Sequence, residues 1–325
     1  MDQAIIMTNL KVVGQYEYKN QFKILPTPED APMPDAVFGW PYPCIIQYEN
    51  DGDFDDIERY GHKVPGTFVK GRHSEKILSE ILSILSLFSI YRFFQYHSEK
   101  SWFVTINNIV EKPNIQLHCG FANFSYDLNN NSKVMSYPQI KMITPEEYYK
   151  YDCTYNFNEP YVSFPDILPL LLDKYFELDN DTKLAYLTSS TLFNQGKEML
   201  IKGYGSIAFA ILVSSIENLV SYIHKDEKPE SCPTCGNINY SVTRKFKDFM
   251  NKFAGNTPEF KKYAEQIYKQ RSKILHSGSL FLGEVEPISL DETEDLQLSY
   301  ESDDRRILLK ICRMCLINWL LSQGS

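Results

Sequence analysis

Hydrophobic and polar residues follow a strand-like pattern through most of the first half of the chain. Short runs there alternate apolar and polar positions or are rich in β-branched and aromatic residues, which is typical of strands. These runs are residues 4–13, 17–25, 44–49, 102–110 and 115–124. Residues 73–97 repeat apolar positions at helical spacing and predict one helix among the strands. We therefore expect an α+β domain over residues 1–163.

The second half changes to helical periodicity and predicts a helical bundle over residues 164–325. The residues at 206–224 are apolar nearly all round, so this helix should occupy the centre of the bundle. A loop that contains the sequence CPTCG follows it, and an acidic segment at 284–304 leads to the last helix. The six helices expected are residues 166–178, 179–203, 206–224, 242–253, 257–275 and 305–322.

Composition narrows the class of protein. The net charge of −9 argues against broad, charge-driven binding to nucleic acid or anionic membranes, although a locally basic cleft remains open. The N-terminus has no basic segment followed by an apolar run, and the most apolar stretches are too short to span a bilayer. We expect a cytoplasmic protein with no membrane partner. Seven cysteines without a secretion signal suggest reduced thiols or a metal site more than disulfides.

The stretch YKQRSKILHSG, residues 268–278, carries the strongest candidate chemistry. Arg271 falls on the apolar stripe of its helix, where a guanidinium is costly unless it is paired or faces a wet cleft. His276 follows near the expected helix end, before Gly278. A purely structural reading is also open, because an arginine near a helix C-terminus interacts favourably with the helix dipole.

The two side chains are separated by five positions, which corresponds to about 140° around a continuous helix. One helix therefore does not aim both groups at a single point. Two copies that face each other across a symmetry axis could bring them together, so an active site here would require a dimer.

The R-x-x-x-x-H spacing, in the context Y-x-x-R-S-x-x-x-H-x-G and after a helix containing AFAILVSSIENL, resembles HEPN-domain proteins. It is most similar to the ApeA-like HEPN branch, found among bacterial anti-phage defence proteins, and covers about residues 165–325. The resemblance implies a metal-independent endoribonuclease that acts as a dimer. The products would be RNA ends with a 2′,3′-cyclic phosphate and a 5′-hydroxyl.

The resemblance also implies roles for individual residues. His276 would be the general acid and base, and Arg271 would hold the phosphate and stabilise charge developing on it. Ser272 could support the site. Glu217 lies in an otherwise apolar helix and could orient Arg271, although a structural partner for any buried cation is an equal alternative.

The CPTCG sequence predicts a structural zinc site, because two thiolates in such a turn converge on one ion. Cys232 and Cys235 would supply the first two ligands. Cys312 and Cys315 share one face of the last helix and could complete the set. His224 is an alternative ligand, and ordinary core packing is an alternative role for Cys312 and Cys315. A redox function of CPTCG is a further alternative, without the βαβ context that it would need.

Basic residues gather in two groups near the candidate pair, at 244–247 and 261–273, with Phe and Tyr between them. Such a mixture can follow a phosphate backbone and stack bases, although it is also typical of a solvated helix face. We expect Lys269, Lys273 and Tyr268 to contact RNA. The nine Asp and Glu residues from 284 to 304 could form a linker, or could cover the basic residues and restrain the nuclease.

Two functions remain open from the sequence. The first is a defence ribonuclease or toxin of the abortive-infection type, whose N-terminal domain senses a phage or cellular trigger or selects substrate. The second is a non-catalytic HEPN-like dimerisation module with a partner-binding N-terminal domain. A zinc-dependent hydrolase is disfavoured, since the chain lacks an HExxH motif or a comparable ligand set. For the N-terminal histidines we expect structural roles: His62, His73, His97 and His118.

Overall fold

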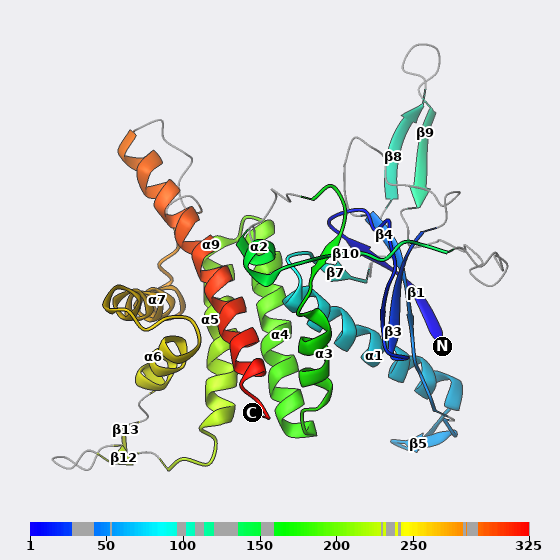
Figure 1. Cartoon of the computed structure of the whole chain (residues 1–325), viewed down its shortest axis with the longest axis horizontal. Helices are drawn as coiled ribbons and strands as arrows, with labels where there is room; N and C mark the ends of the chain where they lie inside the picture. The colour runs from blue at the N-terminus through cyan, green and yellow to red at the C-terminus, as the bar shows by residue number, and fades with distance from the viewer. Residues whose placement is uncertain are drawn as a thin grey trace. The chain divides into compact units, whose positions relative to one another are not determined.

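The structure is a computed structural model of the whole chain (Figure 1). It describes residues 1–27, 42–52, 54–95, 102–107, 114–119, 136–150, 159–228, 230–231, 238–239, 242–281, 284 and 292–324. The chain divides into two compact units whose segments interleave along the sequence. The first unit comprises Met1–Leu82, Tyr91–Met142 and Glu159–Phe164, and the second comprises Ser83–Ile90, Ile143–Asn158 and Pro165–Ser325.

The first unit is built on a five-stranded antiparallel sheet of strand order β2-β3-β4-β1-β7. Its centre is the pair β1–β4, in which Ile6 lies opposite Cys44 and both side chains are fully buried. The strands are β1 (Asp2–Thr8), β2 (Tyr16–Tyr18), β3 (Phe22–Pro26), β4 (Tyr42–Tyr48) and β7 (Phe93–Phe94). The strands expected in the first 50 residues are therefore present, and two of them come from the single run 17–25.

The structure also contains several short two-stranded pairs and one short helix. The β8–β9 hairpin is antiparallel and falls on the two runs expected as strands between residues 102 and 124. These elements are β5 (Ile57–Arg59), β6 (His62–Val64), β8 (Trp102–Asn107), β9 (Asn114–Cys119), β10 (Lys141–Ile143), α2 (Pro145–Lys150), β11 (Ser163–Pro165), β12 (Glu230–Ser231) and β13 (Ile238–Asn239).

Helix α1 (Gly66–Phe88) is the helix predicted over residues 73–97, shifted toward the N-terminus. It begins earlier because the Asp56 carboxylate accepts a hydrogen bond from the Gly66 backbone N–H at 2.8 Å. It ends earlier because Phe93 and Phe94 pair with β1 as β7. The helix belongs to the first unit up to Leu82 and to the second from Ser83.

The second unit is a helical bundle, so the prediction of an α+β region followed by a bundle is confirmed. Helix α5 lies at its centre, packed against α4, α6, α7 and α9. A Cβ atom added to Gly196 of α4 would lie 2.7 Å from Leu212 Cγ, so glycine permits the close approach of α4 and α5. The helices are α3 (Leu168–Phe176), α4 (Asn180–Ile201), α5 (Gly205–Ile223), α6 (Val242–Phe253), α7 (Pro258–Ser277) and α9 (Glu292–Leu321).

Among the helices that the structure describes, α5 alone is long and apolar enough to cross a membrane. More than half of its most apolar window is buried inside the bundle. A central helix of a bundle has this length and composition, because every side of it meets other apolar side chains.

Helix α9 corrects the expectation of an acidic loop ahead of the last helix. It begins at Glu292 rather than at Arg305, and its first turns extend past the other helices of the bundle (Figure 1). Residues 292–304 contain neither Gly nor Pro, and acidic residues near a helix N-terminus interact favourably with the helix dipole. The charged sequence therefore continues the helix.

Candidate active site on helices α5 and α7

Helix α7 places Arg271 and His276 in its last two turns. The Thr257 side chain accepts a hydrogen bond from the Phe260 N–H at the start of the helix, and Pro258 occupies the first turn. At the other end, Gly278 has a φ of 62°, a left-handed conformation that glycine adopts without strain. These two signals fix the helix ends, so both candidate residues are helical.

Arg271 points toward α5 and meets Glu217 there. Its Nη2 donates a hydrogen bond to Glu217 Oε2 at 2.7 Å, and the exposed fractions of the two side chains are 20% and 14%. The guanidinium carbon lies 6.0 Å from the centre of the Tyr268 ring. Within the described residues the buried Arg271 Nε has no hydrogen-bond partner. The guanidinium is thus held in place by one carboxylate and retains unused donor capacity.

Burial has the largest effect on the pKa of Glu217. Burial raises the pKa of this carboxyl above its ordinary value, although the charge of Arg271 and the hydrogen bond from Arg271 lower it. A carboxylate in this position depends on its arginine for much of its stability as a charged group. Arg271 and Glu217 therefore form one electrostatic unit.

His276 lies on the exposed side of α7, away from this pair. No hydrogen bond or ion pair links its ring to another of the described side chains. Ser272 is half-buried, and the structure gives it no hydrogen bond to Arg271, Glu217 or His276. Because Arg271 is turned toward α5 and His276 toward solvent, a single chain keeps the two groups on different faces of the helix.

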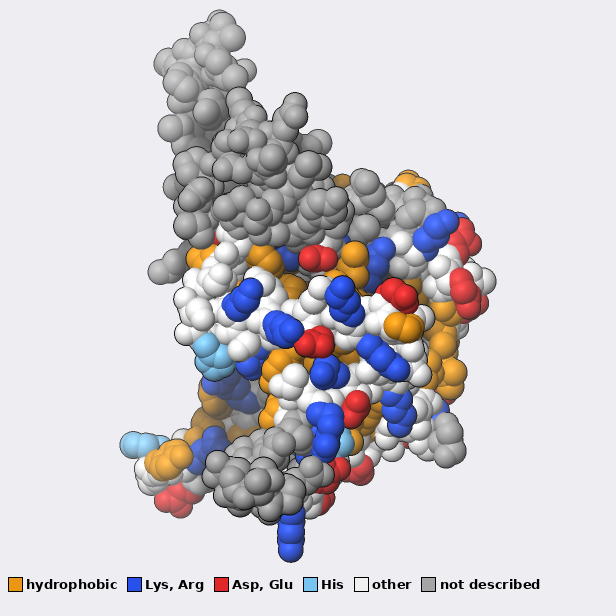
Figure 2. All heavy atoms as spheres, turned by 90° about the vertical axis from the view of Figure 1, so that its left-hand side faces the viewer, with side chains coloured by type: hydrophobic (Ala, Val, Ile, Leu, Met, Phe, Trp, Pro, Cys, Tyr) orange, Lys and Arg blue, Asp and Glu red, His pale blue; other side chains and the backbone are white. Residues whose placement is uncertain are grey.

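The surface of α6 and α7 is basic in an acidic chain. Residues 242–277 contain nine Lys and Arg against three Asp and Glu, a net charge of +6. Figure 2 looks onto the side that carries these two helices, where Lys and Arg side chains predominate over Asp and Glu. Glu265 is one of the three acidic residues, and Lys269 and Lys247 lower the pKa of its carboxyl.

The three residues expected to contact RNA lie in or beside this basic surface. Lys269 and Lys273 are exposed, and Lys269 forms an ion pair with Glu265 at 2.8 Å. Tyr268 is half-buried and packs against Phe246 of α6, with ring centres 5.3 Å apart. Tyr268 therefore joins α6 to α7 and also lies beside Arg271.

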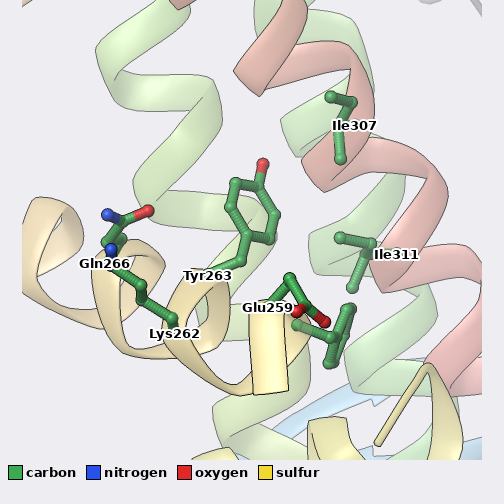
Figure 3. A pocket seen from close by; sticks show the side chains of 7 residues that line it. Glu259, Lys262, Tyr263, Gln266, Ile307 and Ile311 are labelled. Carbon is green, nitrogen blue, oxygen red and sulfur yellow. The ribbon is translucent and has the colours of Figure 1, made fainter. Parts of the chain in front are cut away.

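A groove between α7 and α9 was not identified from the sequence. It has a volume of about 540 Å³ and combines aromatic, aliphatic and polar side chains (Figure 3). Its lining consists of Glu259, Phe260, Lys262, Tyr263, Gln266, Ile307 and Ile311. The apolar periodicity predicts that Tyr263 and Ile311 lie in helices. It does not predict the groove, since nothing in the sequence shows which face of α9 meets α7.

The predicted zinc ligands fall into two groups. Cys232 and Cys235 lie outside the described residues. Cys312 and Cys315 are fully buried in the bundle, where burial raises the pKa of both thiols, and Cys312 Sγ donates to the Leu212 carbonyl at 3.5 Å. Core packing accounts for the position of both thiols, and their role as zinc ligands stays a prediction.

The alternative ligand His224 follows α5 and is already engaged. Its Nδ1 lies 2.6 Å from Glu227 Oε1, and Lys245 pairs with the other oxygen of Glu227 at 2.8 Å. Among the described residues, no group of three or more His, Cys, Asp and Glu side chains is placed to hold a metal ion. A zinc site at Cys232 and Cys235 stays a prediction.

The N-terminal histidines are dispersed. His62 is exposed on β6, and His73 packs its ring 5.0 Å from that of Phe54. His97 lies outside the described residues, and for His118 the structure describes the β9 backbone.

Comparison with protein-family models, with curated proteins and with solved structures gives no match for this chain.

Proposed function

We propose that this protein is a metal-independent endoribonuclease of the HEPN type, which acts as a homodimer in anti-phage defence or as a toxin. The observation that carries the proposal is the state of Arg271. It is a guanidinium whose side chain is 20% exposed, oriented by Glu217, within the segment 242–277 of net charge +6. Arginine in this setting suits recognition of a phosphate group.

The proposed reaction uses groups that the chain supplies. His276 accepts the proton of a ribose 2′-hydroxyl, whose oxygen attacks the adjacent phosphorus. The bond from phosphorus to the 5′-oxygen breaks, and a proton returns to that oxygen. Arg271 donates to the phosphate oxygens as charge develops on them. The products are a 2′,3′-cyclic phosphate and a 5′-hydroxyl.

The orientation of α7 adds a condition to this reaction. Arg271 faces α5 and His276 faces solvent, so the proposed site is composed of Arg271 from one chain and His276 from its partner. In this arrangement the first unit senses a phage or cellular trigger, and the protein acts in the cytoplasm. Ser272 and the lysines of α7 support substrate binding.

The test compares the wild type with His276→Ala and Arg271→Ala on purified RNA, with EDTA present throughout. We expect each variant to lose about 100-fold or more of the cleavage rate, since general acid–base and electrostatic groups contribute at that scale. Mass spectrometry of the products should show 2′,3′-cyclic phosphate ends. In cells, the wild type should degrade RNA and slow growth under phage challenge, and the variants should not.

Matched controls are His62→Ala and Arg59→Ala, which remove an exposed histidine and an exposed arginine of the first unit. Both should cleave at the wild-type rate. Equal cleavage by the wild type and His276→Ala would overturn the catalytic proposal. Equal behaviour with no cleavage by either would favour the alternative, a non-catalytic dimerisation module.

A further inference from the structure

The groove between α7 and α9, here called the α7–α9 groove, lies in the second unit and opens to solvent. Tyr263 rises from α7 toward Ile307 and Ile311 of α9, and Lys262 and Gln266 lie on the other side of its ring (Figure 3). Ile307 is 44% exposed, whereas Ile311 is buried. An aromatic side chain and two isoleucines therefore line one part of the groove.

Polar groups flank the apolar part of the α7–α9 groove: Lys262 and Gln266 lie on one side of the Tyr263 ring, and Glu259 lies on the side of Ile311 (Figure 3). Gln266 carries an amide that can both donate and accept. Hydrogen bonds with the backbone N–H of its own residue and with the Thr257 side chain lower the pKa of the Glu259 carboxyl. Lys262 adds a positive charge. An open groove with aromatic and aliphatic side chains, flanked by a donor, an acceptor and a cation, suits a nucleobase and its phosphate.

The groove is continuous with a row of lysines that leads toward His276. Lys262, Lys269 and Lys273, here called the lysine stripe, lie within about 60° of His276 around the axis of α7. All three are exposed, and no carboxylate among the described residues pairs with Lys262 or Lys273. Lys262 belongs both to the stripe and to the groove.

We propose that the α7–α9 groove binds one nucleobase of a single-stranded RNA whose phosphates follow the lysine stripe to His276. The direction of the strand rests on the proposed ribonuclease function. A duplex would hold its bases inside and leave the groove empty, so the substrate class is single-stranded RNA.

The length of α7 gives the position of this base. Gln266 and His276 are ten residues apart, which is about 15 Å along a helix. At about 3.4 Å per nucleotide in a stacked strand, the base in the groove is about four nucleotides from the cleaved bond. A substrate of two or three nucleotides is too short to reach it.

Crosslinking locates the base directly. The His276→Ala variant is irradiated with single-stranded octamers that carry 4-thiouridine at successive positions, and crosslinked peptides are identified by mass spectrometry. We expect one position, about four nucleotides from the scissile bond, to crosslink within 258–266 or 305–311. Crosslinks that avoid both segments at every position overturn the proposal.

Affinity provides a second measurement. In the His276→Ala background, Ile307→Glu should bind the octamer about tenfold more weakly, because loss of one stacked base costs this much. The control is Leu184→Glu, the same change in size and charge at an exposed residue of α4, which should bind as the parent does. Equal octamer affinity for the two variants contradicts the proposal.

These experiments separate the two proposals. If the wild type does not cleave RNA but the octamer crosslinks to the α7–α9 groove, the ribonuclease proposal fails and the RNA site stands. If the wild type cleaves and the groove neither crosslinks nor affects affinity, the groove proposal alone fails. Absence of both cleavage and RNA binding overturns both.

Discussion

At the scale of single residues, the pairing of Arg271 with Glu217 is the central feature of the second unit. Each charged group stabilises the other in a mostly buried position, since removal of one partner leaves an uncompensated charge. One fifth of the Arg271 side chain stays exposed in this pairing. The ion pair with Glu217 is therefore compatible with the proposed contact between Arg271 and a phosphate.

Glu217 should impose a pH dependence on stability. Because burial raises its pKa above the ordinary value of 4.5, the folded chain binds this proton more tightly than the unfolded chain. Its contribution to the free energy of unfolding is full below pH 4.5 and is lost as pH rises through the raised pKa. We expect Glu217→Gln to gain stability relative to wild type from about pH 4 to pH 7, measured by chemical denaturation.

Glu265→Gln provides the control of opposite sign. Lys269 and Lys247 lower the pKa of Glu265, so its contribution is present above pH 4.5 and is lost as pH falls. This variant should lose stability relative to wild type as pH rises over the same interval. Parallel pH profiles for the two variants would contradict the assignment of these charges.

The sequence predicted part of this residue-scale arrangement. Arg271 interrupts an apolar stripe, which indicated that it points into the bundle, and Glu217 was the acidic residue in the most apolar helix. The contact between them follows because α5 and α7 pack together, and periodicity does not specify which helices are neighbours. The exposure of His276 and the free Arg271 Nε depend on that packing and required the structure.

At the scale of elements, helix ends were predictable where a side chain or a glycine determines them. Asp179 accepts hydrogen bonds from the N–H groups of Asp181 and Thr182, and Thr257 and Gly278 mark the two ends of α7. The start of α9 was wrong because acidic residues were taken as a loop. Strand order was not predictable, since β1 pairs with β4 and β7, which come from distant parts of the sequence.

Arg313 connects α9 to the C-terminal end of α1. It is 2% exposed, its Nη1 donates to the carbonyls of Leu87 and Ser89, and its guanidinium lies 5.0 Å from the Phe193 ring. These carbonyls belong to the last turn of α1 and the residue after it, which have no partners within the helix. The buried Arg313 guanidinium thus supplies hydrogen-bond donors to the carbonyls at the end of α1.

We expect Arg313→Met to lower the free energy of unfolding by about 3 kcal/mol, since two buried carbonyls lose their donor. The control is Arg306→Met on the exposed side of α9, which should change stability by less than about 0.5 kcal/mol. Denaturant titrations of both variants measure the difference. An effect of Arg313→Met no larger than that of the control would show that other groups satisfy these carbonyls.

At the scale of the whole molecule, the proposed site requires two chains, and mixing of inactive variants tests this. Equimolar Arg271→Ala and His276→Ala chains, exchanged by mild denaturation and refolding, should form about half heterodimers, each with one intact composite site. We expect about one quarter of wild-type cleavage. A site contained within one chain would give no recovery, because every chain in the mixture lacks one of the two residues.

The interleaving of the two units along the sequence limits how the gene could have been rearranged by recombination. The helical unit includes Ser83–Ile90, so its core is assembled from sequence on both sides of residue 164. Lys197 Nζ, which is buried, donates to the Ile90 carbonyl at 2.6 Å, and the buried Arg313 Nη1 donates to the Leu87 carbonyl at 2.7 Å. A gene fragment that begins at residue 164 encodes the buried cations without these carbonyls. Recombination could therefore not transfer residues 164–325 alone as a folded domain. A gene fusion that keeps this bundle intact must also include the end of α1.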